Sequence, residues 1–151
     1  ALIALEAGIR TSKRTIKAEN FFRVDVSKTT VLDDDEIVTE VQIPTPPKNA
    51  KSAFLKFALR KSIDFPIVNC AVMIASSKGK VEKAGICLNA VYVTPFRATK
   101  AEEAMIGKAL NEANAEAAGN AAIEGARPLK DNGYMVQIAK VLVKRAILTC
   151  K

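Results

Sequence analysis

Strict alternation of apolar and polar side chains is clearest at residues 52–60, where it predicts a β-strand. One face of this strand carries Ala53, Leu55, Phe57 and Leu59. The opposite face carries Phe54, Lys56, Ala58 and Arg60. The first face is entirely apolar and is expected to pack on a core. The charged segment 61–66 then turns the chain toward a second strand. We therefore expect cations, an acid and an aromatic ring to lie together at the end of an apolar strand.

Three earlier segments also have strand character. Ala1–Leu5 is a short apolar run, Arg14–Lys17 is a second candidate, and Glu36–Ile43 alternates well. Three prolines within residues 44–47 end the last of these. Because proline cannot donate to a strand ladder, residues 44–49 are the best candidate for a domain boundary.

A hairpin is predicted from Ile67–Ser76 and Val81–Val93, with Gly79 supplying the turn conformation. Both faces of these strands are mostly apolar, whereas a sheet with one solvated face alternates with polar residues. Helices are therefore expected to cover one face, and another part of the chain to cover some of the other.

The last third of the chain has helical patterns. Thr99 and Glu102 have the spacing of a capping box, which predicts a helix through Met105. Asn111 is a suitable cap for a second helix ending near residue 124, and a third is expected over about residues 132–149. Strands followed by helices predict an α+β fold: an antiparallel sheet of three to four strands packed with about three C-terminal helices.

Composition excludes several classes of function. The 151 residues carry a net charge of +7, but the cations are spread along the chain, which argues against a nucleic-acid interface. No apolar run approaches the roughly 20 residues of a membrane span. The chain has no histidine, so His-based triads and His metal sites are excluded.

Cysteines and acids give no metal pattern. Cys70, Cys87 and Cys150 are too far apart in sequence for a zinc motif, and we expect them reduced, in the cytoplasm. The acidic run at residues 33–35 lacks the spacing of a calcium loop, so a solvated turn is favoured over a cation site. Because phosphate-binding, dinucleotide-binding and nucleophile motifs are also missing, no catalytic or metal-binding residue is assigned.

The charged turn after residue 55 has two interpretations. Lys56 and Arg60 share one face and can meet an anionic ligand, Asp64 can pair with Arg60 or Lys61 or accept a ring N–H, and Phe65 can stack on a planar ring. Alternatively, the turn is an exposed strand end with a surface ion pair, which contributes roughly 0–1 kcal/mol. The residue chemistry alone leaves both open.

Residues 54–68, FLKFALRKSIDFPIV, resemble the "KFxxRxxxDxxxV" segment in the flavoprotein subunit of molybdenum hydroxylases, the xanthine dehydrogenase and carbon monoxide dehydrogenase family. Further segments resemble the same family in the same order: Arg14-Thr15-Ile16, Glu19-Asn20-Phe21-Phe22, Asp35 to Pro44, Thr94 to Ala98, Ala101 to Ala104, Ala126 to Pro128, and Val141 to Ala146. The resemblance covers essentially the whole chain.

The resemblance implies a division into residues 1–47, the tail of an FAD-binding domain, and residues 48–151, the C-terminal α+β domain. It implies FAD as the cofactor of the full-length subunit, and electron transfer from iron–sulfur clusters through FAD to NAD or another acceptor. An iron–sulfur subunit and a molybdopterin subunit would be the partners. The chain would then be one part of an FAD-dependent oxidoreductase, inactive and without bound FAD by itself. The alternative is a flavin-free interaction or dimerisation domain that forms homo-oligomers through an exposed sheet face.

The resemblance also implies the cofactor-binding residues. Val38 matches a position that touches the flavin, and Lys56 matches a lysine near its polar edge, where a cation favours the anionic reduced ring. A mobile charged loop over the ring is matched by Arg60, Lys61, Asp64 and Phe65. One departure concerns the start of the last helix, where the family often has Tyr-Arg-Arg and this chain has Tyr134-Met135-Val136.

Overall fold

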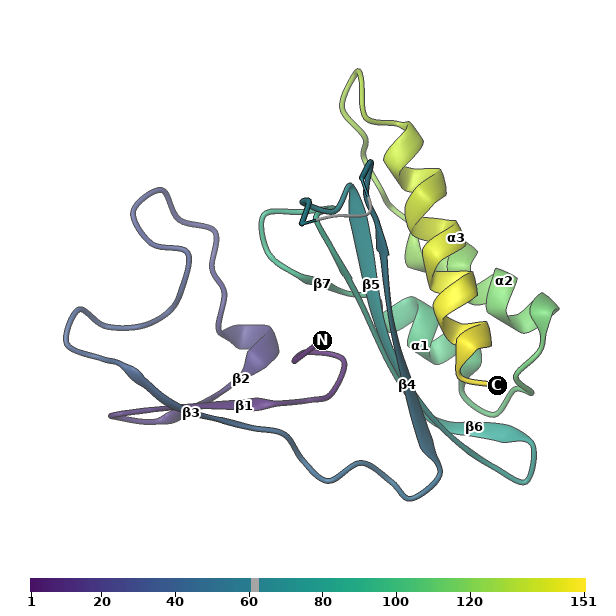
Figure 1. Cartoon of the computed structure of the whole chain (residues 1–151), viewed down its shortest axis with the longest axis horizontal. Coiled ribbons are helices and arrows are strands. Elements are labelled where there is room, and N and C mark those ends of the chain that lie inside the picture. The colour runs from purple at the N-terminus through teal and green to yellow at the C-terminus, as the bar shows by residue number, and fades with distance from the viewer. Residues whose placement is uncertain (61–62) are drawn as a thin grey trace.

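The structure is a computed structural model that describes residues 1–60 and 63–151. Its larger sheet consists of β4 (Ala50–Phe57), β5 (Val68–Ser77), β6 (Lys80–Asn89) and β7 (Phe96–Arg97), in the order β4-β5-β6-β7. All neighbouring pairs are antiparallel. Figure 1 shows this sheet between a layer of helices and a smaller N-terminal lobe, so the predicted α+β fold is confirmed.

The hairpin between β5 and β6 forms as predicted. Ser77 pairs with Lys80 across a two-residue turn in which Lys78 and Gly79 have φ values of 49° and 75°. Positive φ at both positions is the geometry that matches the right-handed twist of paired strands. Strand β6 ends at Asn89, earlier than the sequence suggests, because the chain takes a positive φ of 65° at Ala90 and leaves the sheet.

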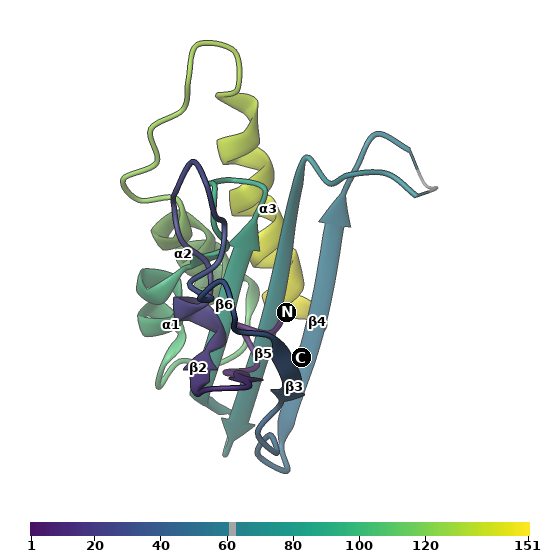
Figure 2. The same ribbon diagram turned by 90° about the vertical axis from the view of Figure 1, so that its left-hand side faces the viewer.

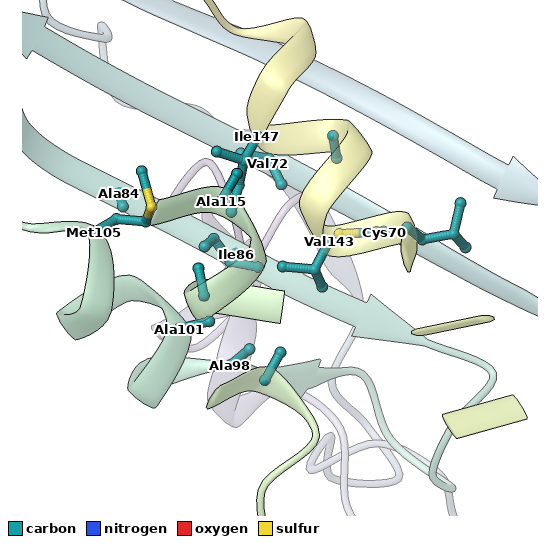
Figure 3. Packing of buried hydrophobic residues seen from close by; sticks show 14 of the residues in the cluster. Cys70, Val72, Ala84, Ile86, Ala98, Ala101, Met105, Ala115, Val143 and Ile147 are labelled. Carbon is teal, nitrogen blue, oxygen red and sulfur yellow. The ribbon is translucent and has the colours of Figure 1, made fainter. Parts of the chain in front are cut away.

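Three helices cover one face of the larger sheet, as expected. They are α1 (Thr99–Met105), α2 (Glu112–Ala122) and α3 (Tyr134–Thr149). Their buried side chains and those of β5 and β6 form the main hydrophobic core (Figure 3). Its largest fully buried members are Ile74, Ile86, Leu88, Met105, Ile147, Val68, Val72, Val81, Val143 and Cys70.

The other face of the sheet is partly covered by the N-terminal lobe, residues 1–43. The lobe contains β1 (Gly8–Thr11), β2 (Thr15–Lys17), the short 3-10 helix η1 (Ala18–Asn20) and β3 (Val38–Gln42), with the strands in the order β2-β1-β3. Figure 2 shows the lobe lying across β5 and β6. Its buried side chains form a second cluster with the outer face of the sheet: Ile3, Ala4, Ala7, Ile9, Ala18 and Phe21 pack with Ala71 and Cys87.

The predicted strand at Ala1–Leu5 is wrong. These residues form a turn in which the Leu5 N–H donates to the Ala1 carbonyl at 3.0 Å. Ile3 and Ala4 are nevertheless buried, because the turn packs against the outer face of the larger sheet. A short apolar run signals burial, but by itself it does not distinguish a strand from a compact turn.

The predicted strand at residues 52–60 is only partly correct. β4 ends at Phe57, where the Ile67 N–H donates to the Phe57 carbonyl at 2.8 Å and closes the following loop. Of the expected apolar face, Ala53 and Leu55 pack against the main core, whereas Leu59 is 83% exposed. The alternation continues in the sequence beyond the point at which the chain leaves the sheet.

The predicted capping box at the start of α1 is also wrong. Ala98 occupies the N-cap position and makes no side-chain cap. The buried Glu102 carboxylate instead accepts the backbone N–H of Ile86 at 2.8 Å and Arg97 Nε at 2.9 Å. The Thr-x-x-Glu spacing alone cannot distinguish a capping box from these contacts, because the Glu102 carboxylate accepts nearby N–H groups in both arrangements.

A second buried carboxylate, Glu36, organises the long segment between β2 and β3. It accepts Thr11 Oγ1 at 2.6 Å, Arg14 Nε and Nη2 at 3.0 and 2.9 Å, and the Asp33 N–H at 3.0 Å. The Arg14 guanidinium, followed by the Thr11 hydroxyl, lowers the pKa of Glu36 to about 2. The neighbouring acids at positions 34 and 35 are exposed and pair with Lys28 and Lys13, as expected for a solvated turn.

Replacing Glu36 with glutamine is expected to lower the melting temperature at pH 7 by roughly 5 °C or more, because the neutral amide cannot accept all these donors. The wild-type pKa lies below the ordinary 4.5, so ionised Glu36 stabilises the fold above that value. This contribution is lost as the pH falls through about 2. Thermal melts of both proteins from pH 7 to pH 2 should therefore converge, and a constant difference would contradict the ionic role.

Candidate functional site

The end of β4 holds most of the predicted site residues. Lys56 lies one residue before the strand ends, and its ammonium donates to the backbone carbonyl of Asp64 at 2.7 Å. Because the charged group binds a carbonyl and not a carboxylate, its positive charge is not neutralised by that contact. Lys56 is exposed to solvent, as expected for a cation that meets a ligand.

Asp64 links the two ends of the charged loop. Its carboxylate accepts the Arg60 N–H at 3.2 Å and the Arg60 side chain at 3.3–3.4 Å. The Asp64 side chain is only 15% exposed, whereas that of Arg60 is 75% exposed. The Arg60 hydrogen bonds lower the pKa of Asp64, and backbone N–H groups and the Lys56 charge act in the same direction. Among the described residues, Asp64 forms its ion pair with Arg60, one of the partners expected from the sequence.

Aromatic and apolar side chains surround these charges. Phe65 is 92% exposed beside Asp64, and Phe54 is 57% exposed two residues before Lys56. Because alternate residues of a strand share a face, Phe54 and Lys56 lie on the same side of β4. Phe54 pairs with Ala71, which contacts the N-terminal lobe, so this is the sheet face that the lobe partly covers.

The structure does not place every predicted residue in this group. Val38 begins β3 in the other sheet, is 43% exposed and pairs with Thr11, so the group at the end of β4 does not include it. Lys61 lies outside the described residues. The structure therefore brings Lys56, Arg60, Asp64 and Phe65 together at the end of β4, whereas Val38 belongs to the other sheet.

A charged cluster that the sequence did not indicate joins the lobe to the larger sheet. Arg97, in β7, donates to Glu19 at 2.7 Å and to Glu102 at 2.9 Å, and lies 3.6 Å from Glu6. Glu6 also accepts Lys83 at 2.5 Å. The Glu102 hydrogen bonds raise the pKa of Arg97, and the Lys83 hydrogen bond lowers the pKa of Glu6. Glu6, the one acid in the apolar run of residues 1–9, was the available signal for this cluster.

The group at the end of β4 combines aromatic surface with a positive charge, which suits contact with a planar or anionic ligand. Phe54 and Phe65 offer exposed aromatic surface, and Lys56 offers an ammonium held in place by a backbone carbonyl.

The three cysteines are buried, and burial raises the pKa of Cys70 to about 12, so they are not reactive thiolates. Among residues 1–60 and 63–151, no cluster of acids and cysteines has the arrangement of a metal site, and no helix is long and apolar enough to cross a bilayer.

Comparisons with known proteins point to one family. Residues 53–150 match the family described as the CO dehydrogenase flavoprotein C-terminal domain. The carbon monoxide dehydrogenase medium chain of Hydrogenophaga pseudoflava is 30% identical over 89% of this chain and 47% of its own length. The glyceraldehyde dehydrogenase medium chain of Sulfolobus acidocaldarius is 27% identical over 96% of this chain and 53% of its own.

Solved structures agree with these relatives. A carbon monoxide dehydrogenase from Hydrogenophaga pseudoflava that lacks the Mo-pyranopterin moiety of the molybdenum cofactor superposes with a TM-score of 0.86 and 32% identity. Quinoline 2-oxidoreductase from Pseudomonas putida 86 superposes with a TM-score of 0.85 and 27% identity. These alignments cover 97% and 99% of this chain and 53% of each matched chain, so this chain spans about half the length of its relatives.

Proposed function

Because this chain belongs to the CO dehydrogenase flavoprotein C-terminal domain family, we propose that it is part of an FAD-containing electron-transfer subunit of a molybdenum hydroxylase. The observation that carries the proposal is the family match together with the exposed aromatic and cationic group at the end of β4. In the complete subunit, electrons would arrive from iron–sulfur clusters and leave to NAD or another acceptor. Substrate oxidation would occur on a molybdopterin subunit.

We further propose a domain boundary near residue 47, within the proline-containing linker between β3 and β4. This linker joins two separate sheets, and its residues are exposed. The family match begins at residue 53, shortly after the linker. Residues 1–47 would then be the end of an FAD-binding domain, and residues 48–151 the C-terminal domain.

The proposed cofactor-binding residues have distinct roles. Bound FAD would supply the exchange of electrons between donor and acceptor. Lys56 would place a fixed positive charge near the polar edge of the ring and favour its anionic reduced form. Asp64 would hold Lys56 through its carbonyl and Arg60 through its carboxylate. Phe65 and Lys61 would belong to the loop that covers the ring, and Val38 would contact it from the lobe.

Replacing Lys56 with alanine in the full-length subunit is expected to weaken FAD retention and to lower the flavin potential. Loss of one nearby cation worth about 1.4 kcal/mol corresponds to a shift of about 30 mV for a two-electron couple. Asp64→Ala is also expected to weaken FAD retention, because it frees the loop that holds Lys56 in place. Spectroelectrochemical titration and the ratio of FAD to protein after gel filtration measure both effects.

Lys51→Ala is the matched control. Lys51 lies on the same strand, but its ammonium donates to the Lys151 carbonyl, away from the proposed site. It should leave retention and potential unchanged. Normal retention and normal potential in both Lys56→Ala and Asp64→Ala would refute the site assignment.

The exposed apolar side chains also support a second candidate function. Phe54 and Phe57 are 57% and 44% exposed on β4, an edge strand, and Val41 is 46% exposed on the edge strand β3. Such surfaces are typical of interaction domains. A flavin-free full-length protein that forms homo-oligomers, and loses them on Phe54→Ser, would favour this alternative.

A further inference from the structure

We infer that Arg97 is a positioning residue that fixes the N-terminal lobe against the larger sheet and so sets the spacing between the two walls of the proposed flavin site. This inference rests on the proposed function. One wall is the end of β4 with Lys56, and the other is the lobe strand β3 with Val38. The two walls lie in different sheets, so contacts between the sheets must fix their relative position.

Arg97 is well placed for this role because its guanidinium reaches both sides of the boundary. Toward the lobe it contacts Glu19 at 2.7 Å and Glu6 at 3.6 Å. Toward its own domain it contacts Glu102 at 2.9 Å, and Glu102 is anchored in turn by the Ile86 N–H. Hydrogen bonds between ionised groups are short and directional, so this arrangement resists sliding as well as separation.

The lobe partners of Arg97 bracket the strands that position Val38. Glu6 comes just before β1 (Gly8–Thr11), and Glu19 comes just after β2 (Thr15–Lys17). β3 pairs with β1, and Val38 is the partner of Thr11. A displacement of Glu6 and Glu19 would therefore move the whole three-stranded sheet, including Val38.

Within the larger sheet, a row of directly paired residues connects Arg97 to β4, the strand that carries Lys56. Arg97 pairs with Cys87, Cys87 with Ala71, and Ala71 with Phe54. Neighbouring strands are about 4.8 Å apart, so roughly 14 Å of paired backbone separates Arg97 from Phe54. A hydrogen-bonded sheet is stiff across its strands, and the position of Arg97 is thus rigidly related to that of Lys56, two residues beyond Phe54.

Besides Arg97, the lobe contacts the sheet through an apolar cluster and through the ion pair of Glu6 with Lys83. Half of the buried members of the apolar cluster at the boundary are alanines, whose small side chains bury area but interlock little. A cavity of about 250 Å³ lies beside Arg97, lined by Ile3, Glu6, Ala7, Lys17, Ala18 and Glu19. Ion pairs therefore hold the two acids in place: Arg97 contacts both Glu6 and Glu19, and Lys83 of β6 also pairs with Glu6.

The test compares Arg97→Gln with Arg97→Lys in the full-length subunit. We expect Arg97→Gln to lose FAD about tenfold faster and to change the visible circular dichroism of the bound flavin. Arg97→Lys keeps one charge and should give intermediate values. Lys100→Gln, which removes an exposed ion pair with Glu124, is the control and should behave as wild type.

Hydrogen exchange on the same proteins separates this inference from the proposed function. Backbone amides of β1 and β2 should exchange faster in Arg97→Gln, while those of β5 and α3 stay protected. Raised salt should accelerate the same lobe amides in the wild type and less so in Arg97→Gln, because salt screens ion pairs and, of those described between lobe and sheet, the variant keeps only the one between Glu6 and Lys83. Unchanged lobe exchange, or faster lobe exchange with an unchanged flavin signal, would overturn the inference. A wild-type subunit without FAD would instead refute the proposed function, and the exchange data alone would then decide whether Arg97 holds the lobe.

Discussion

Ile147→Ala is expected to lower the free energy of unfolding by about 3–4 kcal/mol, because it opens a cavity where α3 meets the larger sheet. Ile147 is 0% exposed and shares the main core with Val72 and Ala115 (Figure 3). The side chains around it come from β5 and from a second helix, and they cannot all collapse into the space left by three carbons. Urea denaturation followed by far-ultraviolet circular dichroism measures the change.

Val141→Ala on the same helix is the control. Val141 is 40% exposed on the outer side of α3, so its removal forfeits little buried surface, and alanine is the better helix former. The change should stay within about 0.5 kcal/mol of wild type. Similar losses for Ile147→Ala and Val141→Ala would show that α3 does not pack on the sheet in this orientation.

Gly85→Ala is expected to displace the N-terminal lobe, at a cost of about 2–3 kcal/mol. A Cβ atom at Gly85 would lie 2.3 Å from the Ala4 carbonyl oxygen and 3.1 Å from its carbon, far closer than atoms normally approach. Both neighbours are backbone, so no side chain can rotate away. The turn at residues 2–6 must therefore lift from the sheet, and the amides of β1 should lose protection in hydrogen-exchange measurements.

Gly133→Ala is the control for this change, because a Cβ atom there meets nothing within 4 Å and the backbone is helical, with φ of −55°. It should leave both stability and exchange unchanged. If Gly85→Ala also leaves the β1 amides protected, the turn does not lie against β6 in solution.

Much of the fold was predictable because its signals are local. The turn at Gly79 and the cap at Asn111 each depend on neighbouring residues, and both are confirmed. The second apolar face of β5 and β6 also predicted a cover on each side, and the lobe supplies the second cover. Errors arose where a local pattern has two physical solutions, as at residues 1–5 and at Glu102.

The candidate site was predictable in part for the same reason. Lys56, Arg60 and Asp64 are close in sequence, so a turn after β4 was enough to bring them together. Their role in holding a flavin stays a prediction. Glu6, Glu19 and Arg97 were not predictable as a cluster, because they are 13 and 78 residues apart along the chain and meet only when the lobe lies on the sheet.

Local sequence patterns predict the type and order of most elements, the apolar character of both faces of the central hairpin, and the resemblance to a flavoprotein family. These follow from short-range propensities and from periodicity. Three features became visible only in the folded chain: the point at which β4 ends, the buried turn at residues 1–5, and the contacts by which Arg97 joins the lobe to the sheet. Those features depend on contacts between distant segments, which no local pattern encodes.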